Sequence, residues 1–249
     1  MYILCGVLAG LLGGYMGLGG GVIMVPYMTI FLGMDIKEAV PVSMIAIVVG
    51  TLSASTPYLK KSMVDTEQVV IISLFMVIGS VIGSLVSAVI SSAILQILFS
   101  LVTVYAGVMM VVKRGNRKPP IHKDHGARYY VLAGVISLVV GVFAALVGLG
   151  GGIFIIPILY LLFGKSIDEA RGTSSLTIGF AAAAAAIVYF FNGQLDPIAA
   201  APVILGVAAG GTVGGHLGTG ARPTVVKIIF LIIMLYIAYK LGMEGFKNL

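Results

Sequence analysis

Apolar and polar positions alternate along the chain in long blocks, which divide it into eight hydrophobic runs. These runs cover residues 3–32, 38–58, 67–90, 93–112, 128–163, 172–191, 197–217 and 224–241. Most are close to the roughly 20 residues that a helix needs to cross ~30 Å of hydrocarbon, and none has the period of two that is typical of barrel strands. The pattern therefore predicts an all-α polytopic membrane protein with four segments in each half, of which the first is too long for one upright crossing.

The second half of the sequence repeats the first. The pentapeptide Gly17-Leu18-Gly19-Gly20-Gly21 recurs as Gly148-Leu149-Gly150-Gly151-Gly152, an offset of 131 residues. The same offset aligns the following residues without a gap, among them Pro26 with Pro157, Gly33 with Gly164, Glu38 with Glu169, Ser43 with Ser174 and Tyr58 with Tyr189. We expect two homologous transmembrane repeats, 1–113 and 128–249, joined by a basic loop at 114–127. The first segment of each repeat is predicted to break at its glycine-rich turn.

Composition excludes several classes of protein. Hydrophobic residues make up 59% of the chain and charged residues 10%, whereas soluble domains carry about 25% charge. The single cysteine, Cys5, excludes an internal disulfide and a thiolate metal site. The net charge of +6 falls mostly in loops and ends, where it sets orientation and meets anionic lipid. We expect a multi-pass protein of the cell inner membrane that contacts lipids and uses no nucleic acid, metal or cofactor.

The basic residues also bear on topology. The connector between the halves holds Lys113, Arg114, Arg117, Lys118, Lys123 and Arg128, which predicts that it is cytoplasmic. Four crossings per half would return both termini to the cytoplasm and make the repeats parallel, although Arg222 and Lys227 argue against that count. If each glycine break instead turns the chain back as a re-entrant hairpin, the repeats are inverted. The sequence leaves both arrangements open.

The glycine breaks suggest a chemistry. Residues 22–32 and 153–163 are long enough for ~16 Å of helix, about half a bilayer, so each is predicted to begin within the membrane. Glycines tolerate positive φ, and the free N–H groups of a helix start form a positive end that favours anions. Gly19, Gly20, Gly21, Gly150, Gly151 and Gly152 are therefore candidate ligands. The alternative is close helix packing, which we favour for other glycines, including Gly79, Gly83, Gly210 and Gly214.

A second constellation opens the sixth segment. Arg171 precedes Ser174 and Ser175 at i+3 and i+4, which places the three on one helical face. A guanidinium beside two hydroxyls supplies forked donors suited to a small oxyanion. The first repeat keeps Ser43 but has no arginine, so the predicted site is asymmetric. The alternative is that Arg171 lies at the membrane interface and pairs with an acid one turn away.

Other polar residues have simpler explanations. His216 could carry a coupling proton, but its place near a segment end favours an interfacial role. Tyr58 and Tyr189 are predicted to anchor at the interface, and Asp65 and Asp196 to cap helices. Neither a carboxylate pair nor a Ser/His/Asp set is embedded in a segment. The sequence therefore does not predict an enzyme.

These motifs together resemble the sulfite exporter TauE/SafE family. The resemblance lies in the duplicated GLGGG, the hydrophobic run with a proline that follows it, the next glycine, and the turn leading to a Thr/Ser-containing helix. It covers nearly the whole chain. It implies export of sulfite or a related organosulfonate or thiosulfate. The first repeat departs from the pattern, with Pro41 and Val42 where the second has Gly172 and Thr173, which places the stronger ligand role in the second half.

The resulting hypothesis is a transporter that holds a small sulfur-containing anion between its repeats and exposes it to each side in turn. An anion channel, a permease for another small anion and a structural membrane subunit remain alternatives. Small-residue faces would suit a homodimer as well as packing within one chain.

Overall fold

The computed structural model describes residues 1–111, 127–218 and 224–249. Capping residues mark where several of its helices start. Asp35 and Asp65 each accept a hydrogen bond from a backbone N–H of the following turn, and Ser166 forms a capping box with Glu169. The helices are α1 (Tyr2–Met16), α2 (Gly21–Leu32), α3 (Ile36–Lys60), α4 (Thr66–Val89), α5 (Ser92–Val111), α6 (Ala127–Val147), α7 (Gly152–Phe163), α8 (Ile167–Phe191), α9 (Pro197–Gly218) and α10 (Thr224–Lys247).

The fold is all-helical over the described residues, with ten helices and no strand. Five helices have the length and hydropathy to cross a membrane, namely α3, α4, α6 from Arg128, α8 and α9. Large apolar side chains face outward along them, such as Val70 with 69% and Leu205 with 68% of its surface exposed. Such side chains suit contact with lipid, so the chain is a multi-pass membrane protein.

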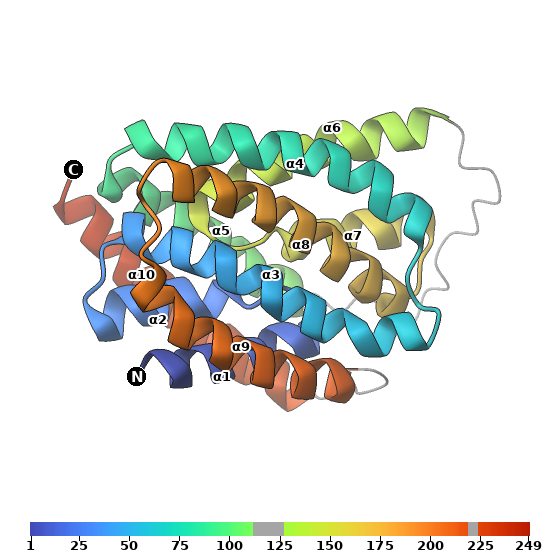
Figure 1. Ribbon diagram of the computed structural model, residues 1–249, viewed down its shortest axis with the longest axis horizontal. Coiled ribbons are helices and arrows are strands. Elements are labelled where there is room, and N and C mark those ends of the chain that lie inside the picture. Colours follow the sequence, from blue (N-terminus) through green and yellow to red (C-terminus); the bar gives the residue numbers. More distant parts are fainter. Residues whose placement is uncertain (112–126, 219–223) are drawn as a thin grey trace.

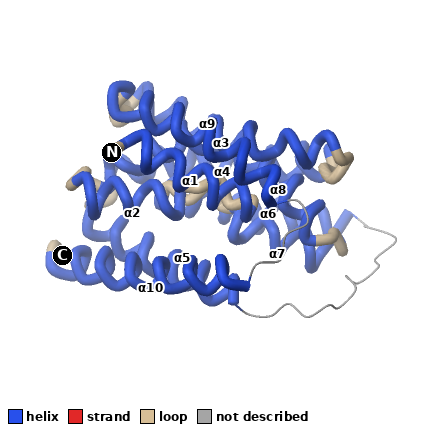
Figure 2. Tube along the Cα trace, turned by 90° about the horizontal axis from the view of Figure 1, so that it is seen from below, coloured by secondary structure: helices blue, strands red, loops and turns tan. Residues whose placement is uncertain are grey.

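Helices from opposite halves of the sequence pack against one another. α1 lies along α9 and α4 lies along α6, while α3 and α8 contact each other near the middle of the molecule (Figure 1). α5 and α10 form a separate pair along one edge (Figure 2). The hydrophobic core of the molecule is built from residues of both halves of the sequence. Neither half therefore forms a separate domain.

Glycines allow these helices to approach closely, as the sequence predicted. A Cβ at Gly79 would lie 2.0 Å from the carbonyl oxygen of Leu138, and one at Gly214 would lie 2.2 Å from that of Leu11. Gly83 and Gly210 are as tightly enclosed by backbone. The packing interpretation of these four glycines is confirmed, because no side chain would fit between the α4 and α6 or the α1 and α9 backbones.

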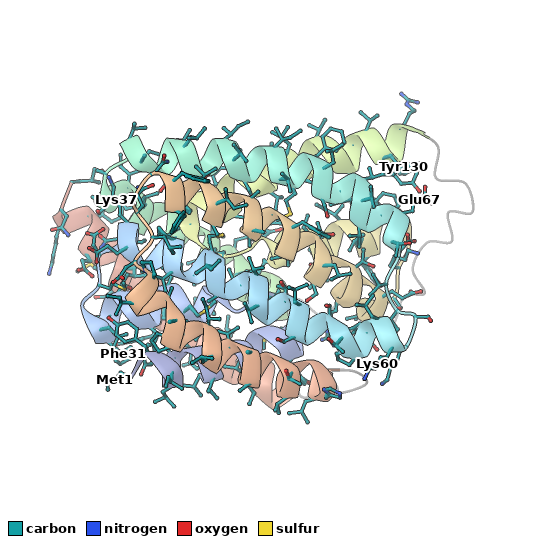
Figure 3. The ribbon with its side chains drawn as sticks, in the orientation of Figure 1. Met1, Phe31, Lys37, Lys60, Glu67 and Tyr130 are labelled. Carbon is teal, nitrogen blue, oxygen red and sulfur yellow. The ribbon has the colours of Figure 1, made fainter. Side chains whose placement is uncertain are left out.

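The path of the chain turns back between α1 and α2. Met1 and Phe31 lie at the same end of the molecule, whereas Lys60, Glu67 and Tyr130 lie at the opposite end (Figure 3). The thiol of Cys5 on α1 also lies 3.9 Å from the carbonyl oxygen of Met24 on α2. The two helices therefore run side by side in opposite directions, with residues 17–20 between them.

Candidate functional site

Two glycine segments lie at the centre of the candidate site. We call residues 17–21 the first glycine segment and residues 148–152 the second. In the first, Gly17, Gly19 and Gly20 have φ of 72°, 81° and 83°, and the corresponding glycines of the second have φ of 73°, 76° and 84°. Side chains rarely adopt these values, so glycine is required at each position. All six glycines predicted as ligands are buried in the structure.

The two glycine segments touch each other directly. A Cβ at Gly21 would lie 2.1 Å from the carbonyl oxygen of Gly148, and one at Gly152 would lie 2.8 Å from that of Gly17. Ile47 on α3 and Ile178 on α8 pack against both segments. The starts of α2 and α7 thus lie together inside the protein, each beside a carbonyl group of the other segment.

Ser43, which the sequence predicts as a ligand, lies against backbone carbonyl groups. Its hydroxyl lies 2.7 Å from the carbonyl oxygen of Val40 and 3.0 Å from that of Gly148, and it is fully buried. This hydroxyl can donate only one proton, and both of its neighbours are acceptors. Ser43 therefore ties α3 to the second glycine segment.

Arg171 lies beside the first glycine segment. Its Cβ and Cγ would be 3.0 and 3.1 Å from a Cβ at Gly17. Its guanidinium donates from Nη1 to the carboxylate of Asp168 at 3.3 Å and to the carbonyl oxygen of Gly218 at 3.2 Å. The side chain is only 13% exposed. The pairing with an acid one turn away is confirmed, and it occurs within the helix bundle.

Four buried hydroxyls occur on the helices that surround Arg171. Ser174 and Ser175 follow it on α8, Tyr58 lies near the end of α3, and Tyr15 lies near the end of α1. None of the four hydroxyls has a hydrogen-bond partner of good geometry within the described part of the chain. The guanidinium of Arg171 nevertheless lies close enough to the hydroxyl of Tyr58 to interact with it as a donor. Arg171 acts electrostatically on both tyrosine hydroxyls. Buried polar groups usually have partners, so these hydroxyls on the helices around Arg171 call for an explanation.

The interfacial role predicted for Tyr58 and Tyr189 is wrong, because both side chains are fully buried. Tyr189 donates to the carbonyl oxygen of Ala145 at 2.9 Å. The hydroxyl of Tyr58 instead points toward Gly218, where an added Cβ would lie 2.8 Å from it. Sequence reasoning missed both Tyr58 and Tyr15 as site residues, although Tyr15 precedes the glycine pentapeptide by only two positions.

The remaining polar candidates lie away from this cluster. His216 is exposed, and its Nδ1 lies 2.8 Å from the carbonyl oxygen of Thr212. Asp196 accepts from the backbone N–H of Ile198 at 2.8 Å, which confirms its capping role. The basic connector predicted between the halves and Arg222 lie outside the described residues.

An ion pair joins the two halves at the end of the molecule where α8 begins. Lys165 Nζ lies 2.6 Å from Asp65 Oδ2, and the backbone N–H of Asp65 donates to Thr173 Oγ1 at 3.1 Å. Burial raises the pKa of Asp65, but Lys165 and the backbone N–H groups of the first turn of α4 outweigh it, so the net pKa is lowered. A pocket of about 300 Å³ opens here between residues 62–66 and Lys165.

Comparison with known proteins identifies the family. The family model described as sulfite exporter TauE/SafE matches residues 2–241. A probable membrane transporter protein of Bacillus subtilis, YunE, is 25% identical over 98% of this chain and 97% of its own length. YdhB of the same organism is 23% identical over 93% and 95%, and a probable membrane transporter protein of Haemophilus influenzae is 26% identical over 88% and 87%. No solved structure matches. The chain belongs to the sulfite exporter TauE/SafE family and is a membrane transporter.

Proposed function

We propose that this chain exports a small sulfur-containing anion, such as sulfite, thiosulfate or an organosulfonate, across the cell inner membrane by alternating access. The observation that carries the proposal is the position of Arg171, a partly buried guanidinium that lies beside the first glycine segment and close to the hydroxyl of Tyr58, on a helix that also carries two buried serine hydroxyls without partners. The description of the family as sulfite exporters supports the choice of sulfur oxyanions.

The chemistry of the cluster suits an oxyanion. Guanidinium N–H groups form paired, directional hydrogen bonds with oxygens that carry negative charge. The hydroxyls of Ser174 and Ser175 can donate to further oxygens of the same ligand. The starts of α2 and α7 add the positive ends of two helices nearby. We therefore infer that the anion lies between Arg171 and the first glycine segment, with the two serines as further ligands.

An inverted arrangement of the halves would supply the moving parts. Adding 131 to the bounds of α2 and α3 gives those of α7 and α8. The pairing of α1 with α9 corresponds under the same offset to that of α6 with α4. The reversal between α1 and α2 leaves α3, α4 and α5 to cross in the first half. If α6 and α7 form the corresponding hairpin, α8, α9 and α10 cross in the second, and α6 does not span the membrane in spite of its length. Three crossings per half favour inverted over parallel repeats. We infer a two-fold axis in the membrane plane that passes between Ile47 and Ile178.

The distribution of positive charge orients this arrangement. Lys60 lies at the same end of the molecule as Tyr130 of α6 (Figure 3). Lys61 follows Lys60, Arg128 is the second residue of α6, and Lys165 precedes α8 and pairs with Asp65. In the sequence the basic connector comes directly before α6. The positive-inside rule makes this end cytoplasmic and places both termini on the opposite face. A membrane potential that is negative inside then drives an anion outward with about 2.3 kcal/mol per charge per 100 mV. Export needs no coupling ion under these conditions.

The proposal is tested first by thermal stability of the purified protein in detergent. Sulfite under nitrogen, thiosulfate, sulfoacetate, sulfate, phosphate and chloride would be compared at matched ionic strength. A ligand that binds the folded state stabilises it by RT ln(1 + [L]/Kd), about 2.7 kcal/mol at 100 times Kd. We expect a saturable rise with a sulfur oxyanion, and saturable counter-transport of the same anion in proteoliposomes. A rise of equal size with every anion would contradict the assignment.

Arg171→Ala and Lys165→Ala form a matched pair for the site. Each removes one partly buried cation from the same end of the molecule, and each cation is paired with an aspartate. We expect Arg171→Ala to abolish the sulfite-dependent rise and Lys165→Ala to retain it. Undiminished sulfite binding by folded Arg171→Ala would remove the arginine from the site. Flux that rises linearly without saturation would favour a channel instead.

A further inference from the structure

Two corresponding tyrosines of the chain differ in how their hydroxyls are used. Tyr58 and Tyr189 are related by the 131-residue offset and are both fully buried. Tyr189 donates to the carbonyl oxygen of Ala145 at 2.9 Å. Gly14 is the residue that corresponds to Ala145 under this offset. The hydroxyl of Tyr58 nevertheless bonds no backbone carbonyl within the described residues, and the polar side chain that acts on it is Arg171. Burial alone therefore does not explain the tyrosine at position 58.

Tyr15 adds a second hydroxyl of the same kind. Its side chain is 9% exposed, and its hydroxyl is likewise without a partner in the described chain. Leu146 occupies the corresponding position of the second half, so the hydroxyl is present only on the side of the molecule that holds Arg171. Electrostatic interactions link Tyr15, Tyr58 and Arg171 to one another. The side chains of Arg171 and Tyr58 meet at Gly218, at the end of α9: Nη1 of Arg171 donates to the carbonyl oxygen of Gly218, and an added Cβ there would lie 2.8 Å from the hydroxyl of Tyr58. The backbone carbonyl oxygen of Tyr15 would lie 2.7 Å from the same Cβ.

We propose that Tyr15 and Tyr58 are ligands of the transported anion, which each contacts through a hydrogen bond from its hydroxyl to an oxygen of the anion held by Arg171. This inference rests on the proposed function and deepens it. Leaving a buried hydroxyl without a partner has a free-energy cost, because the group has lost its hydrogen bonds to water. A ligand that accepts from both hydroxyls removes that cost when it binds.

The proposal also assigns a basis for selectivity. The carboxylate of Asp168, 3.3 Å from Nη1 of Arg171, offsets part of the positive charge before any ligand arrives. Part of the affinity must then come from neutral donors that add to the contribution of Arg171 and lie in several directions. An anion with three or four acceptor oxygens can meet donors from α1, α3 and α8 at once, whereas chloride offers a single centre. We therefore expect the tyrosines to favour oxyanions over halides.

Tyr58→Phe and Tyr15→Phe test the proposal, with Tyr189→Phe as the matched control. Each substitution removes one oxygen and keeps the ring. Purified full-length variants would be titrated with sulfite under nitrogen and with thiosulfate, by calorimetry and by thermal stability. We expect Tyr58→Phe to weaken binding of the preferred oxyanion by about tenfold or more, and Tyr15→Phe to weaken it in the same direction. Neither should lower the melting temperature without ligand.

The control variant should behave in the opposite way. Tyr189→Phe loses the hydrogen bond to Ala145, so its melting temperature should fall while its anion affinity stays within about twofold of the wild type. A role of Tyr58 in merely positioning Arg171 would weaken oxyanions and chloride alike, so the ratio of sulfite to chloride affinity is measured for each variant. We expect this ratio to fall in Tyr58→Phe.

Three outcomes overturn the proposal, and they can be told apart. Wild-type affinity in both Tyr58→Phe and Tyr15→Phe, together with lost binding in Arg171→Ala, would remove the tyrosines and leave the proposed function standing. An unchanged ratio of sulfite to chloride affinity would make Tyr58 a positioning residue. Absence of sulfur-oxyanion binding in the folded wild-type protein would overturn the proposed function itself, and the ligand roles with it. If Tyr58→Phe is not folded, Tyr15→Phe alone decides.

Discussion

The surroundings of the two glycine segments share a backbone and differ in polar chemistry. Beside the first segment lie Arg171, its partner Asp168 and hydroxyls without partners. Beside the second segment, Val40 takes the place of Arg171. A Cβ at Gly148 would lie 3.1 Å from Cγ2 of Val40. Lys37 takes the place of Asp168 in the sequence.

The hydrogen bonds follow the same division. At the second glycine segment, Ser43 bonds backbone carbonyls and Tyr189 bonds that of Ala145, so these hydroxyls serve the fold. Their counterparts, Ser174 and Tyr58, have no such bonds in the described structure. The difference teaches that two glycine segments with the same backbone conformation can have hydroxyls that bond backbone carbonyls in one case and hydroxyls that are left without such bonds in the other.

The largest expected effect comes from placing an arginine in the second site. Val40→Arg buries a positive charge beside the second glycine segment. Arg171 is paired with Asp168, three positions earlier, whereas the residue three positions before Val40 is Lys37, which is basic and cannot form such a pair. An unpaired charge in the membrane costs roughly 2.5–3.5 kcal/mol on insertion scales. We expect a severe loss of folded protein in size-exclusion chromatography. Val40→Leu, which adds volume without charge, is the control, and a normal yield of Val40→Arg would show that the two environments are more alike than their contacts indicate.

A methyl group at the contact between the glycine segments should have the next largest effect. Gly21→Ala brings a Cβ to within 2.1 Å of the carbonyl oxygen of Gly148, which is backbone and cannot rotate away. Such overpacking typically costs about 1–3 kcal/mol. Gly33→Ala has the strain of a φ of 67° but meets nothing within 4 Å, so it serves as the control. Melting temperature should fall more for Gly21→Ala, and the reverse order would contradict the proposed close contact.

The two corresponding serines should separate stability from binding. Ser43→Ala removes a buried hydrogen bond and should destabilise the protein by about 0.5–1.5 kcal/mol without changing anion affinity. Ser174→Ala removes a hydroxyl that has no partner in the described structure, so stability should hold while anion affinity falls. Thermal melts with and without sulfite measure both quantities. Equal behaviour of the two variants would remove the functional distinction between the sites.

The smallest expected effect concerns the ion pair of Asp65 with Lys165. Under the 131-residue offset these two residues correspond to Asp196 and Met34, so the sequence provides no equivalent ion pair for Asp196. The pKa of Asp65 is lowered in the folded state. The pair therefore contributes stability above the unfolded pKa of about 3.9, and this stability is lost as pH falls through the folded value. We expect Asp65→Asn to cost up to about 1 kcal/mol at pH 7 and to converge with the wild type at lower pH. Asp196→Asn is the control, since Asn still accepts the capping hydrogen bond from Ile198 and the described structure gives Asp196 no ion pair that the substitution would remove.

The glycine segments and Arg171 could be found from the sequence because each is a local signal. A repeated run of glycines and an arginine at the start of an apolar segment stand out without any contact information. The role of Ser43 and the burial of Tyr58 could not be found in this way. Both depend on which groups of the other half of the chain pack around these side chains. The residue type at one position does not reveal its neighbours in the folded protein.

The sequence by itself determined the helical membrane class, the family and the places where the helices break, because hydropathy, glycine content and capping are properties of short stretches of chain. Only the tertiary structure decided which glycine segment carries the polar cluster and which hydroxyls are left without partners. The physical reason is that α1 packs on α9 and α4 on α6. Each half therefore completes the surroundings of the other, and Arg171 of the second half comes to lie beside Gly17 of the first.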